Sequence, residues 1–97
     1  MHVIALRSIR LFWEKYPDAE SSLRAWHLLV TETRWANVAE IQAQFPNVSV
    51  LNDRRVVFNI GGNKYRLVVK VKYSSKKVFV RFIGTHAEYD RINANEV

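Results

Sequence analysis

The sequence predicts an α+β domain in which a helical N-terminal half packs on one face of an antiparallel sheet. In the first half of the chain, apolar side chains recur every three or four positions, as they do on the inner face of a helix. Residues 55–90 instead contain valine- and aromatic-rich runs broken by Gly61-Gly62 and Ser74-Ser75, which is typical of strands joined by turns. A chain of 97 residues, 48% of them hydrophobic, supports one core and therefore a single domain over residues 1–97.

The helical half opens with residues 2–6, a short apolar run typical of a strand. Ser8 is expected to cap a first helix, whose inner face is formed by Ile9, Phe12, Trp13 and Tyr16. Pro17 interrupts this helix, and a second is expected over residues 18–31, with an inner stripe of Ala19, Leu23, Trp26 and Val30. The capping-box pattern of residues 37–40 predicts a third helix that ends near residue 44.

Three consecutive strands are expected to follow, and Gly61-Gly62 suits a two-residue turn with positive φ at both positions. Strand alternation places Tyr65, Leu67, Val69, Val71 and Tyr73 on one face of the second strand, and Lys64, Arg66, Val68, Lys70 and Lys72 on the other. In the third strand, Val78, Val80 and Phe82 share one side, and Lys77, Phe79, Arg81 and Ile83 share the opposite side. The second face is therefore expected to stay open and to display rows of cations.

The chain is expected to end in a short helix that begins at a second capping box, Thr85-His-Ala-Glu88. In this motif the Thr85 hydroxyl accepts from the backbone of residue 88, and the Glu88 carboxylate accepts in return from the backbone of residue 85. Residues 93–97 carry no pattern that would hold them in place, so we expect them to be frayed.

The whole chain has a formal net charge of +6, and the positive charge is concentrated in its strand-rich half. Residues 1–53 hold five Lys/Arg and six Asp/Glu, whereas residues 54–97 hold ten and three. This asymmetry indicates a polyanionic partner, namely nucleic acid, an acidic membrane surface or an acidic protein. The alternative is a solvated sheet face whose lysines only keep the protein soluble.

Composition excludes several classes of protein. The chain has no cysteine, so it forms no disulfide and no thiolate metal site, which is consistent with a reducing, cytoplasmic compartment. No apolar run approaches the ~18 residues of a membrane span, and the N-terminus lacks the pattern of a signal peptide. No cluster of His, Asp and Glu has metal-ligand spacing, so neither a metal nor another cofactor is expected.

Two segments, Phe58-Asn-Ile-Gly-Gly-Asn-Lys-Tyr-Arg66 and Arg81-Phe-Ile-Gly-Thr-His-Ala-Glu-Tyr-Asp90, resemble the HigB family of bacterial toxins, which belong to the wider RelE-like mRNA interferases. The resemblance covers nearly the whole chain and implies a RelE-like fold. It implies an endoribonuclease toxin that cleaves mRNA, usually on the translating ribosome. It also implies a partner, a HigA-type helix-turn-helix antitoxin.

Metal-free cleavage of RNA needs a base for the 2′-OH, cations for the phosphorane and an acid for the 5′-oxygen. Arg66 and Arg81 are the candidates for transition-state charge, because a guanidinium binds two phosphate oxygens at once. His86 is the candidate for acid–base chemistry, and Tyr89 is the candidate to stack on a base or to donate to the leaving oxygen. The candidate RNA-binding residues are Lys64, Lys70, Lys72 and Lys77.

Each candidate also has a purely structural interpretation. His86 can hydrogen-bond Asp90 one helical turn later, Tyr89 can lie at the rim of the core, and the two arginines can be solvated. Two other functions therefore stay open. A non-catalytic RNA- or ribosome-binding module would use the same basic face without acid–base chemistry, and a protein-interaction domain would use it to bind an acidic partner.

Overall fold

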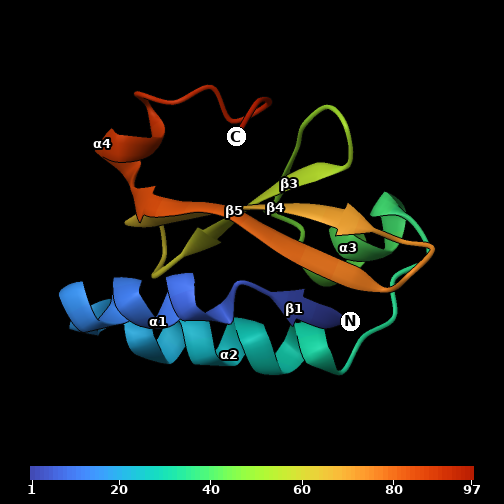
Figure 1. Ribbon diagram of the computed structural model, residues 1–97, viewed down its shortest axis with the longest axis horizontal. Coiled ribbons are helices and arrows are strands. Elements are labelled where there is room, and N and C mark those ends of the chain that lie inside the picture. The colour runs from blue at the N-terminus through green and yellow to red at the C-terminus, as the bar shows by residue number, and fades with distance from the viewer.

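The computed structural model describes residues 1–97 and contains a five-stranded sheet with the strand order β1-β5-β4-β3-β2 (Figure 1). The strands are β1 (His2–Ile4), β2 (Ser49–Val50), β3 (Arg55–Ile60), β4 (Tyr65–Lys72) and β5 (Lys77–Thr85). The helices are α1 (Leu6–Lys15), η1 (Pro17–Ala19), α2 (Glu20–Thr31), α3 (Val38–Gln44) and α4 (His86–Tyr89). Strand β1 pairs with β5 in parallel, and all other pairs are antiparallel. The predicted α+β class is confirmed.

Helices α1 and α2 lie side by side beneath the sheet and bury their apolar stripes against it (Figure 1). The predicted inner stripe of the second helix is buried throughout, from Ala19 to Val30. From the sheet, the core receives Phe58 of β3 and the predicted inward residues of β4. Trp35, after α2, is also buried, and its indole nitrogen donates to the Gln44 side chain. None of the helices has the length and apolar character needed to cross a bilayer.

Two predicted boundaries are wrong. Helix α1 begins at Leu6, before Ser8, because Ala5 adopts a left-handed conformation (φ 73°) that ends β1, and its carbonyl accepts from the Ser8 amide. In the hairpin, Gly61 and Gly62 do have positive φ, but Ile60 pairs with Tyr65, so the turn has four residues. Lys64 therefore belongs to the turn, and the expectation that it shares a face with Arg66 is wrong.

A β-bulge interrupts the pairing of β4 with β5. Val69 lies opposite Val80 and Val68 lies opposite Phe82, so Arg81 has no partner on β4. The extra residue resets the two-residue alternation of β5. Phe82 consequently lies on the face away from the helices, and Ile83 packs against the main core, which is the reverse of the predicted sides.

The segment after α4 folds back across the second face of the sheet, so the expectations that it is frayed and that this face is open are wrong. Ala94 is only 9% exposed and packs with Val57 and Val68. The partly buried side chains around it are Leu51, Phe82, Tyr89, Ile92 and Val97. We call residues 91–97 the tail. Because Val57 and Val68 are apolar on a face that lacks helices, the tail supplies the cover they need.

Candidate functional site

Helix α4 is fixed at its first turn by the predicted capping box. The Glu88 amide donates to the Thr85 hydroxyl at 3.1 Å, and the Thr85 amide donates to the Glu88 carboxylate at 2.8 Å. The second of these bonds is the main reason why the pKa of Glu88 lies below its ordinary value. The His86 amide donates to the Lys64 carbonyl, which ties the start of α4 to the β3–β4 turn.

His86 is oriented by Asp90. Its Nδ1 lies 3.0 Å from a carboxylate oxygen of Asp90, and the two side chains are 54% and 60% exposed. A purely structural role for His86 predicts this hydrogen bond to Asp90, and the same bond is compatible with catalysis. A carboxylate only accepts hydrogen bonds, so Nδ1 carries the hydrogen, and the neutral ring keeps its lone pair on Nε2. Nε2 is thus free to take a proton from a substrate.

Arg66 and Tyr89 lie at the same end of the β4–β5 pair as His86. Arg66 pairs with Gly84, two residues before His86, and its guanidinium donates to the carbonyls of Asn63 (3.0 Å) and Tyr65 (3.3 Å). Tyr89 is half-buried, with its ring 6.5 Å from that of Phe82, and its hydroxyl makes no hydrogen bond within the protein. The fold therefore brings three of the four predicted catalytic residues to one end of the sheet.

Arg81 lies farther along the same face. It is three residues from Gly84, which corresponds to roughly 10 Å along a strand. Its Nε donates to the Val97 carbonyl at 3.2 Å, and its two terminal nitrogens make no hydrogen bond. An arginine side chain spans only part of this distance. Arg81 therefore lies next to the site formed by Arg66 and His86 but does not contact it.

The predicted RNA-binding lysines do not form one group. Lys70 and Lys72 lie beyond Arg81 at the far end of β4, where Lys72 pairs with Lys77. Lys64 points instead toward the helical layer, where its ammonium lies 3.0 Å from Asp18 of η1. Three of the four lysines thus extend the second face away from His86.

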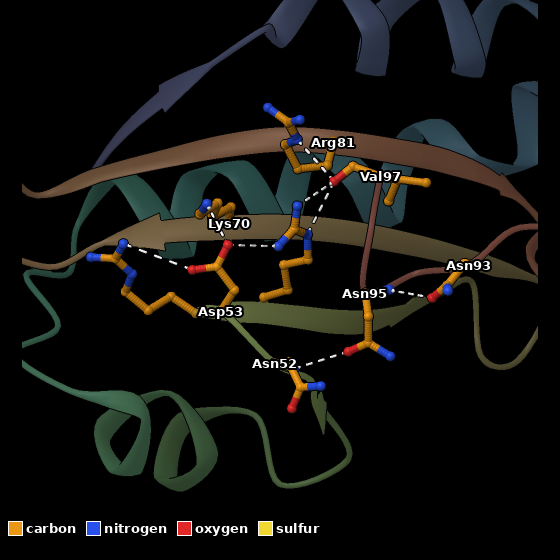
Figure 2. Close-up of polar contacts among 9 residues, drawn as sticks. Asn52, Asp53, Lys70, Arg81, Asn93, Asn95 and Val97 are labelled. Carbon is orange, nitrogen blue, oxygen red and sulfur yellow. Dashed lines mark hydrogen bonds and ion pairs between the residues drawn. The ribbon is translucent and has the colours of Figure 1, made fainter.

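A network of charges that the sequence did not reveal joins the tail to this face (Figure 2). Arg55 is buried, only 7% exposed, and donates twice to the Val97 carbonyl, at 3.0 and 2.9 Å. Its third bond, of 3.1 Å, is to Asp53, which also accepts from Lys70 at 2.8 Å. The Lys70 bond, followed by the Arg55 bond, holds the pKa of Asp53 below its ordinary value. The only sequence signal for this network was the charge run of residues 53–55, which ends at the first residue of β3.

The candidate catalytic residues all fall within the region that a known family matches. The sequence profile of the HigB toxins, described as the RelE-like toxic component of a toxin–antitoxin system, matches residues 19–92. The chain belongs to this family. It is 32% identical over 96 residues to the mRNA interferase toxin HigB of Escherichia coli (strain K12). The alignment covers 97% of this chain and 92% of that protein. The mRNA interferase HigB of Shigella flexneri matches to the same extent.

A second relative from Escherichia coli, the mRNA interferase HigB of strain O6:H1, is 30% identical over 94 residues. These alignments extend across both halves of the chain. The predicted membership of the HigB family is therefore confirmed, and the protein is the toxic component of a toxin–antitoxin system.

In this HigB-family toxin, the glycine turn is anchored to the helical layer by Asp18. The Tyr65 hydroxyl and the Lys64 ammonium both donate to this carboxylate. The Tyr65 bond is the main cause of a lowered pKa for Asp18, and the same bond raises the pKa of Tyr65 to about 12. Asp18 therefore holds the turn whose Asn63 and Lys64 carbonyls contact Arg66 and α4.

We expect Asp18→Asn to return the titration of Tyr65 toward that of an ordinary tyrosine. The bond to the Asp18 carboxylate favours the neutral phenol, so its contribution to stability is complete below the unfolded pKa of about 10 and is lost as the pH rises through about 12. Absorbance of tyrosinate at alkaline pH measures the titration. Glu20→Gln is the control, because it alters a carboxylate on α2 that pairs with Arg24 and not with Tyr65. A Tyr65 titration that Asp18→Asn leaves unchanged would contradict the assignment.

Proposed function

We propose that this HigB-family toxin is a cytoplasmic endoribonuclease that cleaves mRNA on the translating ribosome and is neutralised by a HigA-type helix-turn-helix antitoxin. The relatives in Escherichia coli and Shigella flexneri are named mRNA interferases. The observation that carries the proposal is the position of Arg66, His86 and Tyr89 at the same end of a basic sheet face. A general base, a cation and a phenol at one place are the groups that metal-free cleavage requires.

In the proposed reaction, the ribose 2′-OH of the substrate is the nucleophile. His86 Nε2 takes the 2′ proton as the 2′-oxygen forms its bond to phosphorus, and the Arg66 guanidinium stabilises the negative charge of the phosphorane. The bond from phosphorus to the 5′-oxygen then breaks, and that oxygen leaves with a proton from the Tyr89 hydroxyl. The products are a 2′,3′-cyclic phosphate and a 5′-hydroxyl. The free terminal nitrogens of Arg81 bind the next phosphate or share the charge.

The remaining cations extend this site along the RNA. Lys70, Lys72 and Lys77 continue the second face beyond Arg81 and would hold phosphates on one side of the scissile bond. Lys64 would have to release Asp18 before it could bind RNA. Affinity for RNA should therefore fall steeply with salt concentration, since each phosphate contact releases counterions.

The test is to add the purified protein to ribosomes that are translating a defined mRNA. We expect cleavage products with 5′-hydroxyl ends, which polynucleotide kinase labels without prior phosphatase treatment, and we expect co-purified antitoxin to prevent cleavage. The same mRNA without ribosomes measures the dependence on translation. Salt-sensitive binding that leaves ribosome-bound mRNA intact would instead identify a non-catalytic RNA-binding module.

A further inference from the structure

Phe79, near the start of β5, is a half-buried aromatic residue that neither hydrophobic core uses. It lies on the face that the tail crosses, between Ile4 of β1 and Lys70 of β4. It belongs to neither cluster of packed side chains and takes part in none of the ring–ring contacts in the protein. Because neither core holds this ring, it is available to stack on a ligand.

The space beside Phe79 is a shallow cavity of about 290 Å³ whose walls are mostly cationic. Its lining residues are Arg54, Lys70, Val71, Lys72, Phe79 and Arg81. The cavity lies beyond the end of the tail, because Val97 stops at Arg55 and Arg81 (Figure 2). Its size is near the lower limit for small-molecule sites, about 300 Å³.

The cations of this cavity are only partly neutralised. Lys70 is bound to Asp53, and Arg54 lies at 3.9 Å from the same carboxylate. Lys72 makes no hydrogen bond or ion pair, and Arg81 keeps its terminal nitrogens free. Four cations thus line the cavity around one ring, and the one carboxylate paired with any of them is Asp53, which leaves an excess of positive charge for an anion.

We propose that this cavity binds one unpaired nucleotide of single-stranded RNA, with the base stacked on the Phe79 ring and a phosphate held by Lys72 and Arg81. The inference rests on the proposed function, since the RNA would be the same strand that is cut near His86. A ring flanked by cations is the usual recognition element for single strands, because every base can stack whereas only unpaired bases are accessible. Phe79 lies five residues from Gly84, or roughly 16 Å along β5, so the nucleotide is a flanking one.

The test uses a 2′-O-methyl RNA oligonucleotide that contains 2-aminopurine, whose fluorescence is quenched when the base stacks. Such an oligonucleotide has no free 2′-OH and cannot be cleaved. We expect Phe79→Leu to weaken binding by roughly tenfold and to abolish the quenching, and Phe79→Trp to retain both. Lys72→Gln should lower the slope of binding against salt by about one phosphate contact. Trp13→Leu, which removes a half-buried ring in the helical layer, is the matched control.

The same variants are compared for cleavage of ribosome-bound mRNA, where the loss in Phe79→Leu should lie in KM more than in kcat. Unchanged quenching and unchanged KM in Phe79→Leu, alongside normal cleavage by the wild type, overturn the nucleotide site but not the nuclease. Equal defects in Phe79→Leu and Phe79→Trp also overturn it, because stacking would then not be the cause. The nucleotide site is also overturned if Phe79→Leu weakens binding of the antitoxin but leaves RNA binding intact. If the wild type cuts no mRNA, the proposed function itself fails.

Discussion

Replacement of His86 with alanine is expected to lower mRNA cleavage by roughly 10²–10⁴-fold, the range attributed to a general base. The Nδ1 atom is occupied by Asp90, and the His86 side chain is 54% exposed at the end of the sheet where Arg66 also lies. Alanine removes Nε2 but leaves the capping box of α4 intact. Cleavage of ribosome-bound mRNA measures the effect in vitro, and growth after tightly controlled expression measures it in cells.

The control for this prediction is His27→Ala, which removes an imidazole on α2 at no predicted site. It should leave both cleavage and growth arrest unchanged. The double variant Arg66→Ala/His86→Ala should also be inactive, because the two residues serve the same step. Growth arrest that survives both alanines, with the variant shown to be folded, would refute this assignment of the active site.

Replacement of Arg55 with methionine is expected to detach the tail and to lower the free energy of unfolding by about 2 kcal/mol, the value typical of hydrogen bonds to a charged group. Arg55 is buried and makes two of its three side-chain bonds to Val97. Methionine fills the same position without the charge. Urea unfolding measures the stability. Hydrogen exchange of the amides of residues 91–97 measures the release of the tail.

Arg7→Met is the matched control, since Arg7 is exposed on α1 and makes no ion pair. We expect its stability and the exchange in its tail to equal those of the wild type. If Arg55→Met is as stable as the wild type and its tail amides exchange no faster, the tail is held by its apolar contacts alone.

Much of the architecture could be predicted because it depends on local periodicity and on motifs. The stripe from Ala19 to Val30 has helical spacing, and Tyr65, Leu67, Val69 and Val71 alternate along β4 with period two. The capping box of Thr85 needs only two residues at a fixed spacing. These features placed Arg66 on the second face and His86 at the start of a helix, which are the main elements of the candidate site.

The tail and the bulge could not be predicted in this way. The tail has no regular spacing, and its attachment depends on contacts with Arg55, which is remote in sequence. The bulge is invisible because valine and phenylalanine suit either face of a strand. One signal was available. Val68 interrupts a row of cations, and an apolar residue at such a position predicts that something covers it.

The β-bulge at Arg81 allows β5 to lose one residue without a change of register in the rest of the strand. In most strands, loss of a residue exchanges the inner and outer faces of everything that follows. Without Arg81, however, Val80 would still pair with Val69, and Phe82 would still pair with Val68. A deletion of this single codon would therefore remove a positive charge and one bond to the tail, while the pairing of the other β5 residues with β4 stayed the same.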